Sequence, residues 1–85
     1  MYLHLGSDYM VATAEVVAII NVETLPPSVL RESLRTAKRQ GPVVHIGEDN
    51  KGKSLVLTDR CAYLSPISSV TLLKRSRGSI EEGNQ

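Results

Sequence analysis

The residues that most resemble a chemical site form a glycine-rich segment in the middle of the chain. Residues 47–54 read GEDNKGKS, which satisfies the phosphate-binding loop pattern G-x-x-x-x-G-K-[ST]. Such a loop holds phosphate through a helix that begins in it, because the helix N-terminus supplies N–H donors. Here the strand-like run 54–58 follows instead, and Glu48 and Asp49 would repel phosphate. We therefore interpret the segment as a hairpin turn after a strand at 43–46.

Four cations on a predicted helix form a second candidate site. The helix is expected from an N-cap at Ser28 to about Gln40, with Gly41 as a left-handed C-cap. One face carries Leu30, Leu34 and Ala37 at helical spacing. A different face carries the cations Arg31, Arg35, Lys38 and Arg39. This face could neutralise a phosphate backbone. The residues alone favour a solvated face in which Arg35 pairs with Glu32.

The charge of the chain is distributed unevenly. Residues 1–30 hold three acids and no Lys or Arg, whereas residues 31–77 hold all ten basic residues and four acids. The net charge of +1 therefore permits a basic face. Lys51 and Lys53 flank Gly52 on an expected loop tip, where functional residues are common.

Other residue types exclude several kinds of chemistry. His4, His45 and the lone Cys61 form no recognisable metal-ligand set, and no nucleophile, base and orienting group can be identified. We expect no enzyme activity, no metal, no cofactor and no small-molecule substrate. With no Phe or Trp, stacking on single-stranded bases is poorly supported. A single cysteine, no apolar run long enough to span a membrane and no signal peptide together predict a cytoplasmic protein.

These residues are carried by an expected α+β fold, with a small mostly antiparallel sheet, one central helix and a short C-terminal helix. A single domain is expected over residues 1–77, followed by a disordered tail over 78–85. The C-terminal helix is expected to be capped by Ser68 or Ser69. The nearly continuous apolar run 15–22 predicts burial on both faces, by the core or by a neighbouring subunit. Because an 85-residue core is thin, we expect homo-oligomerisation. The expected strands are 1–5, 9–13, 15–22, 43–46, 54–58 and 62–64.

Three segments resemble the bacterial extracellular matrix regulator family, and more closely its RemB-type branch. They are MYLHLG at 1–6, EVVAII at 15–20 and SPISSVTLLKR at 65–75. The resemblance covers about residues 1–76 and implies a cytoplasmic DNA-binding regulator of biofilm matrix genes. The RemA-type branch of the family is a ring-shaped homo-oligomer that wraps DNA on an arginine-bearing surface.

In that branch the arginines that contact DNA lie in the turn after the fourth strand, with another early in the chain. The corresponding turn here carries Asp49, Asn50, Lys51 and Lys53, and the early position falls at about Glu15. The resemblance therefore implies duplex DNA as partner, with Lys51 and Lys53 as first contacts. The helix cations named above are the second. The alternative is a non-enzymatic assembly module with little or no DNA binding, which the acidic first third and the weak loop charge favour.

Overall fold

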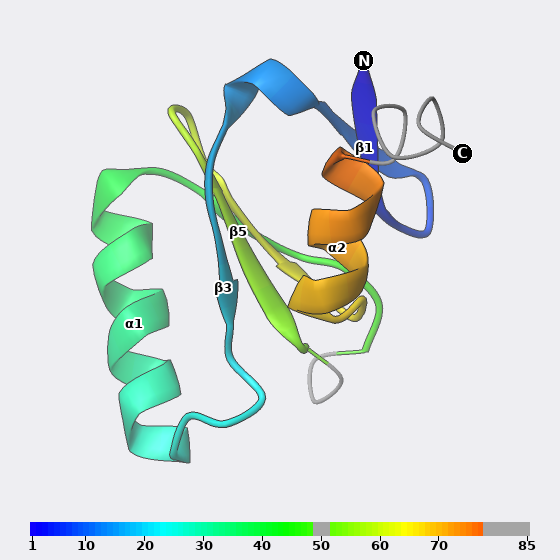
Figure 1. Ribbon diagram of the computed structural model, residues 1–85. Helices are drawn as coiled ribbons and strands as arrows, with labels where there is room; N and C mark the ends of the chain where they lie inside the picture. The colour runs from blue at the N-terminus through cyan, green and yellow to red at the C-terminus, as the bar shows by residue number, and fades with distance from the viewer. Residues whose placement is uncertain (49–51, 78–85) are drawn as a thin grey trace.

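The computed structural model describes residues 1–48 and 52–77. The tail 78–85 and the loop residues Asp49, Asn50 and Lys51 lie outside the described residues, together with the expectations placed on them. The architecture is α+β, as expected, and the elements follow the predicted order (Figure 1). They are β1 (Tyr2–Gly6), β2 (Tyr9–Ala12), a 3₁₀ turn (Thr13–Glu15), β3 (Val16–Asn21), α1 (Pro27–Gln40), β4 (Val43–His45), β5 (Ser54–Thr58), β6 (Ala62–Ser65) and α2 (Ser69–Ser76).

The strands form a separate hairpin and a four-stranded sheet. β1 pairs with β2, and the larger sheet has the order β3-β5-β6-β4. Its β3–β5 and β5–β6 pairs are antiparallel, whereas β4 runs parallel to β6. The prediction of a hairpin turn at 47–53 is therefore wrong. Both edges of β5 are already paired, with β3 and β6, so β4 can pair only on the far side of β6.

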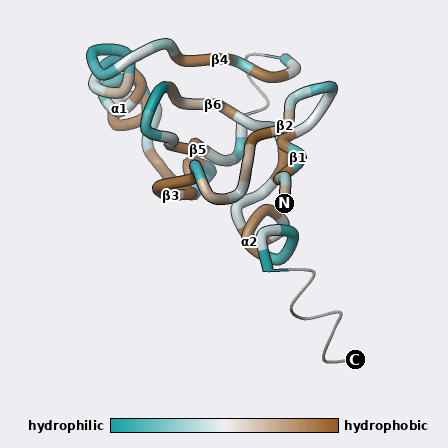
Figure 2. The backbone as a smooth tube through the Cα atoms, turned by 90° about the horizontal axis from the view of Figure 1, so that it is seen from above, coloured by the Kyte–Doolittle hydropathy of each residue, from teal (hydrophilic) through white to brown (hydrophobic). Residues whose placement is uncertain are grey.

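Apolar side chains are buried on both faces of the sheet. One cluster places Leu3, Leu5 and Val11 of the hairpin and Leu72 of α2 against Val56 of β5. A second cluster packs α1 onto the opposite face of the sheet. Figure 2 shows α1 on one side of the strands and the hairpin with α2 on the other. The second cluster comprises Val22, Leu55, Ala62 and Leu64, with Leu30, Leu34 and Ala37 packed on it.

The helix ends show which predicted caps form. Ser68 caps α2, because its hydroxyl accepts a hydrogen bond from the Thr71 N–H at 3.2 Å. The Ser28 cap is wrong: α1 begins at Pro27, whose fixed φ suits the first helical position, and no side chain caps it. Gly41 is extended (φ 165°) rather than left-handed. Glycine is needed there because a Cβ atom would collide with the Arg60 carbonyl oxygen.

The expectation for the run 15–22 is only partly met within a single chain. β3 is an edge strand, and none of its residues is fully buried. Val17 is 70% exposed and Ile20 is 39% exposed. The core of this chain therefore does not cover both faces of β3, and burial by a neighbouring subunit stays a prediction.

Candidate nucleic-acid interface

The predicted basic face of α1 is present and lies in solvent. Leu30, Leu34 and Ala37 face the sheet, and residues three and four apart share a helix face. The four cations therefore turn away from the core on the flank opposite to β3, and all four are exposed. This basic flank consists of Arg31, Arg35, Lys38 and Arg39.

The predicted ion pair of the solvated reading also forms. The Arg35 Nη1 atom lies 3.1 Å from the Glu32 Oε2 atom, and both side chains are more than 60% exposed. An ion pair this exposed contributes only about 0.2–1 kcal/mol, so a phosphate can replace Glu32 at little cost. Within residues 1–48 and 52–77, no ion pair involves Arg31, Lys38 or Arg39. The basic flank therefore carries uncompensated positive charge.

Lys53 is exposed at the end of the sheet near the start of α1. Its N–H donates to the Ser65 carbonyl at 2.8 Å, and its own carbonyl accepts from Val22 N–H at 3.0 Å. Both bonds fix its backbone, while the side chain extends into solvent. A Cβ atom on Gly52 would collide with the Leu64 side chain, so the chain returns to the sheet in close contact with β6.

Arg60 is a cation that the sequence analysis did not place in the site. It lies in the turn between β5 and β6, against Gly41 at the end of α1, and its side chain is 82% exposed. Its Nη2 atom is 3.9 Å from the Glu15 Oε2 atom. Glu15 therefore faces a cation that partly offsets its repulsion of phosphate. No sequence spacing indicates this pair, because 45 residues separate its members.

The cations of α2 lie apart from the basic flank. Lys74 and Arg75 belong to the last turn of α2, on the other side of the sheet from α1. Arg75 Nη1 donates to the His4 carbonyl at 3.3 Å, which ties the helix end to β1. The structure therefore does not combine the two basic groups into one surface.

The residues of the phosphate-loop pattern have another use. Ser54 opens β5 rather than a helix, and its buried hydroxyl donates to the Ile67 carbonyl at 2.6 Å. A phosphate-binding loop needs that hydroxyl free and a helix N-terminus behind it. The rejection of the nucleotide-binding pattern is confirmed.

The cysteine and histidines occupy separate places. His4 Nε2 lies 2.8 Å from the Ser7 carbonyl, and His45 is exposed on β4. Cys61 hydrogen-bonds to Tyr63, and this bond together with partial burial raises the pKa of Tyr63 to about 12. Among the residues that the structure describes, no three His, Cys, Asp or Glu side chains are grouped to hold a metal ion.

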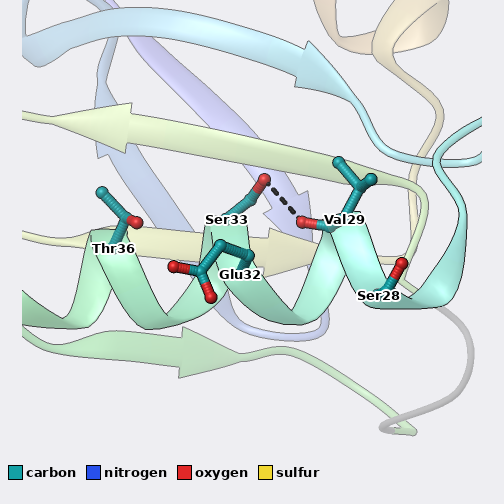
Figure 3. A pocket seen from close by; sticks show the side chains of 5 residues that line it. All are labelled: Ser28, Val29, Glu32, Ser33 and Thr36. Atoms are coloured by element: carbon teal, nitrogen blue, oxygen red, sulfur yellow. Dashed lines mark hydrogen bonds between the residues drawn. The ribbon is translucent and has the colours of Figure 1, made fainter.

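Two surface hollows flank α1. The first, of about 470 Å³, is lined by Ser28, Val29, Glu32, Ser33 and Thr36, and Figure 3 shows Val29, Ser33 and Thr36 on one side of the helix. The second, of about 330 Å³, lies between that side of α1 and the β3–β5 strands. Their linings are mostly apolar or hydroxylated, which suits contact with another macromolecule better than acid–base chemistry. In the described parts of the chain, neither helix is long and apolar enough to cross a membrane.

Comparison with known proteins identifies the family. The RemA-like family, described as extracellular matrix regulatory protein A-like, matches residues 2–75. The chain belongs to this family. It is similar to the Extracellular matrix regulatory protein B of Bacillus subtilis (strain 168), with 35% identity over 81 residues that cover 95% of this chain and 96% of that protein. The predicted resemblance to the RemB-type branch is confirmed.

Proposed function

We propose that the protein is a cytoplasmic, non-enzymatic regulator of extracellular matrix genes, which binds duplex DNA as a ring-like homo-oligomer. The relative from Bacillus subtilis is named an extracellular matrix regulatory protein, and this supports the regulatory role. The basic flank of α1 carries the DNA-binding part of the proposal, because it presents four exposed cations on one rigid element.

The proposed contacts are made mainly to phosphate. Arg31, Lys38 and Arg39 can each neutralise a phosphate, and Arg35 can join them by leaving Glu32. Lys53, with Lys51, can extend the contact at the end of the sheet where α1 begins. Contacts to phosphate carry no sequence information by themselves, so selectivity per subunit is expected to be low.

Several copies are needed to make such a surface effective. One subunit offers few contacts, whereas repeated copies around a ring raise the effective concentration of each further contact. The thin core and the uncovered β3 support assembly, since β3 leaves Val17 70% exposed.

Paired substitutions with equal charge changes test the assigned surface. We expect Arg31→Gln with Lys38→Gln to weaken DNA binding and to lower the slope of log K against log salt by about two phosphates, at about 0.9 per phosphate. Fluorescence anisotropy with a labelled duplex measures both quantities. The matched control is Lys74→Gln with Arg75→Gln on α2, which should leave the slope unchanged.

Lys51→Ala with Lys53→Ala tests the loop in the same assay, and we expect a smaller slope there too. An unchanged slope would remove the loop from the site. Equal losses from the α1 pair and the α2 pair would show that the total charge matters and the basic flank does not.

The second candidate function is an assembly module that binds protein rather than DNA. The uncovered apolar side chains favour it, in particular Val17 on β3 and Val29 on α1, which is 44% exposed. Absence of duplex binding even at low salt, together with a stable oligomer, would support this function instead.

A further inference from the structure

The free edge of β3 is the longer unpaired edge of the main sheet. β3 has six residues and pairs only with β5, whereas the opposite edge strand, β4, has three. None of the β3 residues is charged, and four of them are Val or Ile. Natural proteins usually protect such an edge with charges, proline or a covering element. In the described residues the sheet order leaves this edge of β3 without a partner strand.

The side chains beside this edge are apolar and point to the face that carries α1. Val16 pairs with Thr58 and Ala18 with Leu57, so Val17 is the extra residue of a β-bulge. Val17 lines the 330 Å³ hollow together with Ala37 of α1. Ile20 pairs with Leu55, which belongs to the core cluster under α1. Both exposed side chains of β3 therefore lie on the α1 side of the sheet.

The flank of α1 nearest to β3 carries no charge. It presents Val29, Ser33, Thr36 and Gln40, which lie at helical spacing and line the two hollows. We call the free edge of β3 with Val17, Ile20 and this flank the β3–α1 surface. Interface cores are depleted of charged residues in the same way. The basic flank lies on the other side of the helix, so the β3–α1 surface is unsuited to DNA.

We propose that the β3–α1 surface binds the same surface of a second copy of this chain, with the two β3 strands paired antiparallel around a two-fold axis. This inference rests on the homo-oligomer of the proposed function and names one of its contacts. The paired strands would join two four-stranded sheets into one of eight strands. Both α1 helices would then lie on the same face, with their basic flanks on the outer sides.

Charge complementarity supports a second copy as the occupant. Antiparallel pairing brings the start of each β3 strand beside the end of the other. Arg60 projects near the start of β3, where it approaches Glu15, and Glu23 is exposed just beyond the strand end. Each Arg60 therefore meets Glu23 of the second copy, and the two-fold axis repeats this contact. An assembly larger than a dimer needs one further contact, through a different surface.

A matched pair of valine substitutions tests the pairing. Val17→Lys places a charge in the proposed contact, whereas Val70→Lys places one on α2, where Val70 is 61% exposed. Size-exclusion chromatography with light scattering gives the mass of each purified protein, and circular dichroism verifies that both are folded. We expect Val17→Lys to reduce the oligomer mass at least twofold and Val70→Lys to keep it.

A charge exchange tests the same contact without adding a lysine to the strand. Arg60→Glu and Glu23→Arg should each weaken the assembly, and the double variant should recover it. If the wild type is an oligomer and Val17→Lys keeps its mass, the pairing is wrong while the proposed oligomer stands. A monomeric wild type would overturn both.

Discussion

At the scale of single residues, Tyr63 links the chemistry of the β5–β6 turn to the packing of the hairpin. Its ring meets the ring of Tyr9 edge-on, with centroids 6.4 Å apart, so it joins β6 to β2. The Cys61 side chain, which is half-buried, hydrogen-bonds to Tyr63. This bond is the largest cause of the raised pKa of Tyr63, and loss of solvent around the phenol adds to it.

The raised pKa predicts a loss of stability in alkali. The pKa of Tyr63 rises from 10.0 to about 12 on folding, so the folded protein holds this proton more tightly than the unfolded chain. The stabilisation is complete below pH 10 and declines as the pH rises towards 12. Phenolate absorbance during a pH titration, taken as the difference from Tyr63→Phe, measures the pKa. Cys61→Ala should lower that pKa; an unchanged value would rule out the hydrogen bond as its cause.

At the scale of elements, local signals predicted what forms and failed to predict what pairs. The alternation of apolar residues indicated each strand, and Ser68 indicated the start of α2. The parallel partner of β4 was missed, because periodicity marks a strand without naming its neighbour. Gly41 was misread for a similar reason. A glycine after a helix indicates a left-handed cap, whereas here it makes room for the Arg60 carbonyl, which is a tertiary contact.

The two helix starts predict different responses to the same substitution. Ser68→Ala should lower the free energy of unfolding by about 1 kcal/mol, because the Thr71 N–H loses its hydrogen-bond acceptor. Ser28→Ala should change it by less than about 0.5 kcal/mol, since Ser28 is exposed and does not cap α1. Urea unfolding of both variants gives the comparison. Equal losses would contradict the assignment of Pro27 as the start of an uncapped helix.

At the scale of the whole molecule, the fold separates two kinds of surface on opposite flanks of α1. The basic flank was predictable from the sequence, because helical spacing alone places Arg31, Arg35 and Lys38 together. The Arg60–Glu15 contact was not, since it depends on how the β5–β6 turn meets the start of β3. The uncharged flank was also missed, because its meaning appears only when α1 is seen to leave β3 uncovered.

The near-neutral net charge of +1 therefore describes no single surface of the protein. One flank of α1 offers cations for a phosphate backbone, and the other offers an uncharged surface with apolar side chains for a second copy. The two proposals are compatible, because the contacts use different residues and pairing leaves both basic flanks exposed.

The affinity of the wild-type protein for duplex DNA at two salt concentrations tests the central claim most directly. Binding isotherms at about 50 mM and about 200 mM salt give the change in log K, which depends on the number of phosphates neutralised. Our account predicts clear binding at the lower concentration and a steep loss at the higher one. Absence of binding at the lower concentration, or an affinity that does not change with salt, would contradict it.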